Sequence, residues 1–133
     1  MSQENVEVVR RSLDAYAAGD VDGMLAYIDP EGELHSAIIG GAEGKVYRGH
    51  DGFREWLADS LESFEELRIV ADEFRDLDDR VVMFGRISAR GRESGLELAS
   101  ATGWVFTVRR GRVVKAEGFL NRADALEAAG LRE

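Results

Sequence analysis

Three side chains of this sequence could carry acid–base or anion-binding chemistry: His35, Tyr16 and Arg86. The imidazole of His35 ionises near neutral pH, which suits a general base. Tyr16 lies on the apolar face of a predicted helix, where its hydroxyl could orient a ligand carbonyl or satisfy a polar group of the core. Arg86 shares a strand face with Phe84, so it needs either an anionic ligand or an acidic partner, such as Glu97 on the next predicted strand. We predict His35, Tyr16 and Arg86 as candidate catalytic residues.

Aromatic side chains could form the wall of a site for an apolar ligand, although aromatic residues at such spacing can equally be plain core. Two of them fall on the inward side of a predicted helix and two on predicted strands. A serine beside His35 is a further candidate, but neighbouring strand residues point to opposite faces, so at most one of this pair enters a cavity. The candidate ligand-binding residues are Phe53, Trp56, Phe84, Trp104 and Ser36.

Metal, cofactor, nucleic-acid and membrane functions are disfavoured by composition. The chain has no cysteine, and its two histidines do not form an H-x-x-x-H motif. Seventeen basic against 26 acidic residues give a net charge of −9, which repels phosphate backbones and anionic membrane surfaces. The N-terminus has no basic segment followed by an apolar one, so we expect no secretory signal. We therefore expect a cytoplasmic protein without a metal, a cofactor, a nucleic-acid partner or a membrane partner.

The elements that must position these residues begin with three predicted helices. The first places apolar residues in steps of three and four up to Tyr16 and ends at Gly19. The second begins after Asp20 as its cap and reaches Ile28. The third spans residues 51–64. All three apolar faces need a common core.

After the third helix the pattern changes to that of successive antiparallel strands. β-Branched and aromatic residues dominate four segments separated by short gaps that favour turns. A short strand over residues 33–36 precedes the third helix, a loop covers residues 37–49, and Asn121 caps a last helix that ends before Gly130. The four predicted strands are residues 67–77, 80–90, 96–108 and 112–120.

These elements predict one α+β domain over residues 1–133, with three N-terminal helical segments packed on a mainly antiparallel sheet and a short C-terminal helix. Both faces of residues 80–90 are apolar, whereas the three helices can cover only one face of a sheet. The uncovered face would be buried by a second copy, so we predict a homodimer.

Three segments resemble the nuclear-transport-factor-2-like superfamily, and in particular its SnoaL-like proteins, relatives of ketosteroid isomerase and the polyketide cyclases. They are NVEVVRRSLDAYAAGDVDGMLAYIDPEGELHS, YRGHDGFREWLADS and WVFTVRRGRVVKAEGFLNRADALEAAGL. The resemblance implies a cone-shaped fold. A strongly bent sheet cannot keep full contact with straight helices, so we expect an apolar pocket at the wide end, between the third helix and the sheet. The resemblance is specific for the fold and only weakly specific for function.

The resemblance also argues against one activity. The isomerase-type tyrosine, aspartate base and acidic donor correspond here to Ser12, to Ser36, and to Trp104 or its neighbour Gly103. None of these can replace the missing carboxylates, so we expect no ketosteroid isomerase activity.

The sequence leaves two functions open. One is binding of a small apolar ligand together with cofactor-independent acid–base catalysis on a hydrophobic carbonyl compound. The other is a non-catalytic ligand-binding or scaffolding dimer. Convergence of His35 with Tyr16 or Arg86 in one cavity would favour the enzyme, and an apolar cavity would favour the binding protein.

Overall fold

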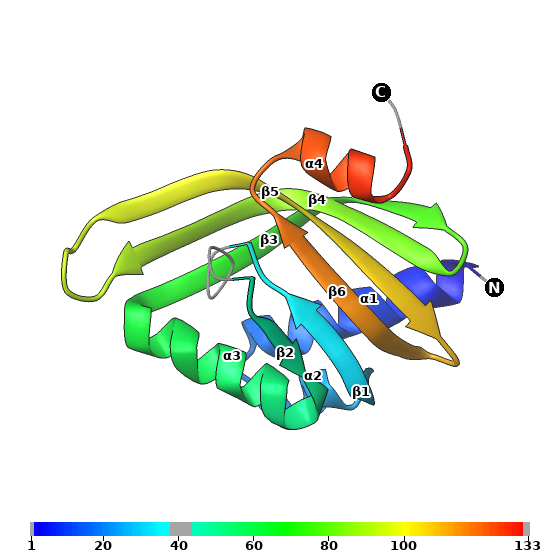
Figure 1. The fold of residues 1–133 in the computed structure, drawn as a ribbon, viewed down its shortest axis with the longest axis horizontal. Coiled ribbons are helices and arrows are strands. Elements are labelled where there is room, and N and C mark those ends of the chain that lie inside the picture. Colours follow the sequence, from blue (N-terminus) through cyan, green and yellow to red (C-terminus); the bar gives the residue numbers. More distant parts are fainter. Residues whose placement is uncertain (1, 38–43, 132–133) are drawn as a thin grey trace.

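A curved sheet with helices on both of its sides organises the chain (Figure 1). The computed structural model describes residues 2–37 and 44–131. Within these residues the elements in chain order are α1 (Ser2–Ala17), α2 (Val21–Leu25), β1 (Ile28–His35), β2 (Val46–Arg48), α3 (Gly49–Ser63), β3 (Phe64–Leu77), β4 (Arg80–Gly91), β5 (Glu97–Arg109), β6 (Arg112–Phe119) and α4 (Arg122–Ala128). The predicted α+β fold is confirmed.

The strands form one sheet in the order β2-β1-β6-β5-β4-β3. Every neighbouring pair is antiparallel except β1 and β6, which run parallel. The turn between β3 and β4 has Asp78 at φ 71°, and the turn between β5 and β6 has Arg110 and Gly111 at φ 54° and 75°. Such left-handed turn residues match the twist of the strands that they join, which fixes the register of the meander.

The caps predicted for the short helices are present. The Asp20 side chain accepts a hydrogen bond from the Gly23 backbone N–H at 2.9 Å before α2. The Asn121 side chain accepts one from the Asp124 N–H at 2.7 Å before α4. Each cap satisfies a donor that the first helical turn leaves open.

The segment around Pro30 differs from the prediction. The second helix ends at Leu25 instead of reaching Ile28, and β1 already begins at Ile28. The pairing of β1 with β6 is irregular between Ile28 and Glu33, which is where Pro30 lies, because proline has no N–H to donate to the ladder. Part of the predicted loop forms β2, and residues 38–43 of that loop lie outside the described residues.

The two faces of the sheet carry separate cores. The larger core lies between the sheet and α1, α2 and α3, and includes Met83 and Trp104. The smaller one lies on the opposite face under α4, and includes Val82, Phe84 and Val105. We call these the inner and the outer face. Among the described residues no helix is long and apolar enough to cross a membrane.

Candidate functional site

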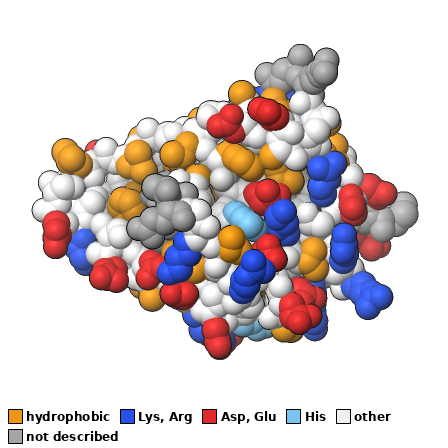
Figure 2. Space-filling view, viewed as in Figure 1, with side chains coloured by type: hydrophobic (Ala, Val, Ile, Leu, Met, Phe, Trp, Pro, Cys, Tyr) orange, Lys and Arg blue, Asp and Glu red, His pale blue; other side chains and the backbone are white. Residues whose placement is uncertain are grey.

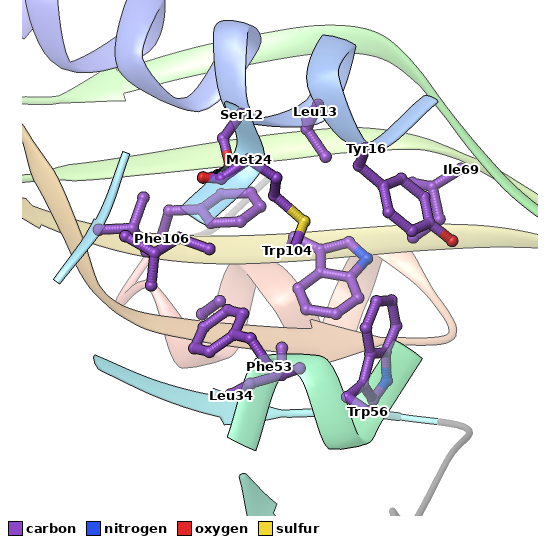
Figure 3. Close-up of a pocket in the computed structure, with 13 residues that line it drawn as sticks. Ser12, Leu13, Tyr16, Met24, Leu34, Phe53, Trp56, Ile69, Trp104 and Phe106 are labelled. Carbon is purple, nitrogen blue, oxygen red and sulfur yellow. Dashed lines mark hydrogen bonds between the residues drawn. The ribbon is translucent and has the colours of Figure 1, made fainter. Parts of the chain in front are cut away.

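An apolar cavity of about 60 Å³ lies between the inner face of the sheet and α1, α2 and α3 (Figure 3). Carbon atoms make up nearly all of its wall, which comes from the three helices and from β1, β3, β5 and β6. The lining residues are Ser12, Leu13, Tyr16, Met24, Ile28, Leu34, Phe53, Trp56, Ile69, Trp104, Phe106, Val113 and Ala116.

Strand alternation places Trp104 and Phe106 together on this wall. They are two residues apart on β5, so both point to the inner face, and their rings stack with centroids 5.9 Å apart and planes at 15°. Gly118 of β6 pairs with Trp104, and a Cβ on that glycine would lie 2.7 Å from the indole ring. Glycine at this position therefore provides the space in which the indole lies flat against β6.

Helical periodicity places Phe53 and Trp56 on the opposite wall. They are three residues apart on α3 and are 4% and 6% exposed. The helix lies close to β2, because a Cβ on Gly52 would be only 2.8 Å from the Tyr47 backbone. Trp56 meets the ring of Tyr16 from α1 at a centroid distance of 5.8 Å and an angle of 40°. The aromatic side chains of α1 and α3 thus face those of β5 across the cavity.

The polar atoms of the wall are neutral hydrogen-bond donors. The Tyr16 hydroxyl donates to the Leu67 carbonyl at 3.1 Å, and the Ser12 hydroxyl donates to the Met24 carbonyl at 3.4 Å. The indole N–H groups of Trp56 and Trp104 are buried and have no acceptor among the described residues. In Figure 3 the Trp104 nitrogen lies on the edge of its ring that faces Tyr16. An unmade hydrogen bond of this kind costs about 1–3 kcal/mol.

Burial makes Tyr16 a poor acid–base group at neutral pH. Loss of hydration raises the pKa of its phenol to about 12. Tyr16 is also the only ionisable side chain among the described residues that line the cavity. The cavity therefore offers a ligand almost entirely apolar contact, and its described lining residues include no ionised base.

His35 lies on the outer face, away from the cavity. Leu34 points inward and lines the cavity, so its neighbour on the strand points outward. There the His35 ring lies 3.0 Å from a carboxylate oxygen of Glu33, whose other oxygen accepts from Arg48 at 2.6 Å. These two partners lower the pKa of Glu33 below its ordinary value. Ser36 follows β1 and is not part of the cavity wall.

Arg86 and Phe84 also lie on the outer face, so neither borders the cavity. Arg86 is 68% exposed and forms two 3.0 Å hydrogen bonds to Asp72. The predicted partner Glu97 pairs instead with Arg90, its direct neighbour in the sheet register. Asp72 lies at an irregularity of β3, and this extra residue brings its carboxylate to Arg86 and lowers the pKa of that carboxylate.

Phe84 is part of the smaller core and not a wall of the cavity. It is 5% exposed and lies under α4, with the Arg122 guanidinium 4.0 Å and that of Arg75 5.3 Å from its ring centroid. Alternation along β4 correctly separates Phe84 from Met83. Phe84 was expected to border the cavity, but its face of β4 packs against α4 and not against the N-terminal helices.

Several cavity residues were not expected from the sequence. Leu34 and Phe106 had a usable signal, since Leu34 alternates with His35 and Phe106 shares the face of Trp104. Ile28 was assigned to a helix and Ile69 to a strand of unknown facing. Met24, Val113 and Ala116 carry no local mark that separates a cavity wall from ordinary core. Among the described residues no group of three or more acidic, histidine or cysteine side chains could hold a metal ion.

Known protein structures share this arrangement. TerC co-crystallised with polyporic acid superposes with a TM-score of 0.79 at 24% identity, over 93% of this chain and 96% of TerC. An NTF2-like protein of unknown function from Burkholderia pseudomallei gives 0.80 at 23% identity, over 93% and 95% of the two chains. A putative SnoaL-like polyketide cyclase from Jannaschia gives 0.76 at 20% identity, over 99% and 95%.

These structural similarities establish the fold, and the sequence comparison is more specific. No curated protein matches the sequence. The model of the SnoaL-like domain matches residues 9–116, which include α2, α3, β1–β5 and all but the first turns of α1. The chain therefore belongs to the SnoaL-like domain family, within the nuclear-transport-factor-2-like superfamily.

Proposed function

We propose that this protein binds a small hydrophobic carbonyl compound in the cavity between its inner sheet face and α1–α3. The observation that carries the proposal is the carbon-lined cavity beside two buried indole N–H groups that have no acceptor among the described residues. Burial of apolar ligand surface supplies the affinity. A carbonyl oxygen that reached Trp56 or Trp104 would give that indole N–H an acceptor.

The proposal is binding and not acid–base catalysis. A general base must reach the proton that it removes, and His35 and Arg86 lie on the outer face of the sheet. Tyr16 is protonated at neutral pH, since the ordinary pKa of tyrosine is 10.0 and burial raises that of Tyr16 further, to about 12. Ser12 and Trp104, which the resemblance aligns with two of the isomerase groups, both line the cavity and contribute only neutral donors.

The relatives support a small-molecule ligand. TerC, which has the same fold, was crystallised with polyporic acid. That ligand is a property of TerC, and the volume of about 60 Å³ in this chain is far smaller than the roughly 300–1,000 Å³ of typical ligand pockets. The head group that fits here is therefore small. We further propose that the protein acts in the cytoplasm as a homodimer.

The test uses a matched pair of probes, cyclopentanone and methylenecyclopentane. They have the same ring, and the C=O group of the first is replaced by C=CH₂ in the second. We expect cyclopentanone to move the indole N–H signals in a ¹H–¹⁵N spectrum, which has two such signals because the chain has two tryptophans. Methylenecyclopentane should bind about tenfold more weakly, because it cannot accept a hydrogen bond. Equal affinities for the two probes would show that the carbonyl group does not contribute to binding.

Two variants separate the cavity from the rest of the molecule. Ala116→Leu adds three carbons to the wall and should reduce cyclopentanone binding at least about tenfold. Ala101→Leu makes the same change at an exposed position of the outer face and should leave binding unchanged. Circular dichroism checks that both variants fold. If cyclopentanone moves neither indole signal, or if Ala116→Leu binds it as well as the wild type does, ligand binding in this cavity is wrong.

A further inference from the structure

A groove of about 270 Å³ opens beside the cavity, where the end of α1 meets α2, the end of α3 and the start of β3. Its wall is mainly apolar and includes Val21, Leu57, Leu61, Phe64 and Leu67. None of its described lining residues is charged. The groove is therefore suited to hydrocarbon.

Tyr16 and Met24 separate the groove from the cavity. Both residues line both spaces, so each side chain has the cavity on one side and the groove on the other. The Tyr16 ring is held by the hydrogen bond from its hydroxyl to the Leu67 carbonyl and by its contact with Trp56. Met24 is an unbranched side chain that adapts its shape readily. A rotation of these two side chains would join the spaces.

The sizes of the two spaces indicate how a ligand would use them. The cavity, at about 60 Å³, is much the smaller of the two spaces, so it suits only a compact head group. Tyr16 and Met24 line both spaces, so the part of a larger ligand that extends past them enters the groove.

The rim of the groove carries exposed apolar side chains. Leu61 is 63% exposed and Val21 is 36% exposed, and both line the groove. Covering either with hydrocarbon removes apolar surface from water, which is favourable by roughly 25 cal/mol per Å². A saturated chain lying along the groove would cover both residues.

We propose that the groove is a second subsite, which binds the uncharged alkyl chain of the ligand whose carbonyl head lies in the cavity. The inference rests on the proposed function and extends it, because it names the ligand class as alkyl-substituted carbonyl compounds. Tyr16 and Met24 mark the point at which the head ends and the chain begins. The affinity of the whole ligand then comes mainly from the groove.

The test is a series of 2-alkylcyclopentanones with chains from ethyl to heptyl, titrated against the wild type and two variants. In the wild type each added methylene should tighten binding about three- to fourfold, until the chain has passed Leu61. Leu61→Glu places a charge at the rim of the groove and should weaken binding of the heptyl compound at least about tenfold. The same variant should bind unsubstituted cyclopentanone as the wild type does.

Leu96→Glu is the matched control, because Leu96 is 73% exposed and does not line the groove. Leu96→Glu should leave the affinity for every compound of the series unchanged. If Leu61→Glu keeps the full gain per methylene, the chain lies elsewhere and the second subsite is wrong. If light scattering shows that Leu61→Glu, and not Leu96→Glu, lowers the molecular mass, a second copy covers the groove and the proposal is again wrong. Failure of cyclopentanone itself to bind would instead count against the proposed function.

Discussion

Tyr16 shows how position alone changes the chemistry of a residue. On α1 its ring forms part of the cavity wall and of the groove wall, and its hydroxyl donates to the backbone of β3. Burial of the hydroxyl disfavours the phenolate, so the pKa is about 12 in the folded protein against an ordinary value of 10.0. A pKa that differs between folded and unfolded chains makes the stability depend on pH.

The sign of that dependence gives a prediction for alkaline pH. The folded-state pKa of Tyr16 is raised, so its contribution is fully present below pH 10 and is lost as the pH rises towards 12. The loss from this residue should be about 2–3 kcal/mol. Tyr16→Phe should therefore show a smaller decrease in the free energy of unfolding over this range than the wild type. Urea unfolding at several pH values measures it.

Tyr47 provides a check on this prediction. Burial, together with its hydrogen bond to Asp59, also raises its pKa to about 12, so part of the alkaline loss should remain in Tyr16→Phe. The double variant with Tyr47→Phe should lose less stability still. An unchanged pH dependence in Tyr16→Phe would show that its hydroxyl is hydrated in the folded protein.

At the residue scale, one structural period decides the direction of some of the side chains proposed for the site. Helical spacing orients Phe53 and Trp56, and helical packing orients Tyr16, so all three could be placed facing the sheet. Phe84 and Arg86 show what strand alternation cannot predict. Alternation gives their shared face but does not say which face borders a cavity, because that depends on where α4 packs.

At the scale of elements, α4 explains why β4 is apolar on both sides. Val81 and Val82 are both fully buried, Val81 in the core under the N-terminal helices and Val82 under α4. The helix lies so close to β5 that a Cβ on Gly103 would be 2.5 Å from the Cβ of Ala125. The apolar outer face is thus partly covered within the chain, and this weakens the argument from β4 for a dimer.

Two glycines on neighbouring strands give a prediction about the cavity. Gly118→Ala would push the Trp104 indole away from β6 and towards the cavity, because the new Cβ would lie 2.7 Å from the ring. We expect it to destabilise the fold by about 1–3 kcal/mol and to reduce cyclopentanone binding at least about fivefold. Chemical denaturation and titration of the indole signals measure the two effects.

Gly103→Ala is the control, since its new methyl group would meet α4 on the outer face. It should destabilise the fold comparably while cyclopentanone still binds. If both variants lost binding in proportion to stability, the position of Trp104 would not be what determines access to the cavity.

The sequence predicts the meander well and the start of the sheet poorly. Residues 67–77 to 112–120 contain regular alternation and strong turn signals, and the structure places four strands there. β1 contains Pro30 and Gly32, which argue locally against a strand. Its pairing partner β6 lies about 80 residues further along the chain, so the pairing that makes it a strand is not a local property.

For the molecule as a whole, charge and exposed apolar surface are both distributed over the outer face. Figure 2 shows acidic and basic side chains interspersed there, with hydrophobic side chains over β4 and β5. Outside the area covered by α4, the exposed apolar residues include Val70, which is 44% exposed, together with Ala99 and Ala101. Arg86 and Asp72 form an ion pair beside them.

This surface is where we expect the second copy of the predicted homodimer. Light scattering at tens of micromolar should give twice the chain mass of 14.7 kDa. Val70→Glu should shift the protein towards the monomer, because it places a charge where apolar surface would be buried. Val21→Glu, at an exposed valine of the groove, is the control and should leave the mass unchanged. A monomeric wild type at this concentration would show the homodimer to be wrong.

The small cavity also has a volumetric consequence. The carbon-lined space is eliminated when the chain unfolds, so the unfolded protein and its solvent occupy less volume. Hydrostatic pressure therefore favours unfolding of the protein without ligand. A molecule seated between Trp56 and Trp104 takes up part of that space, and it makes the fold resist compression as well as heat.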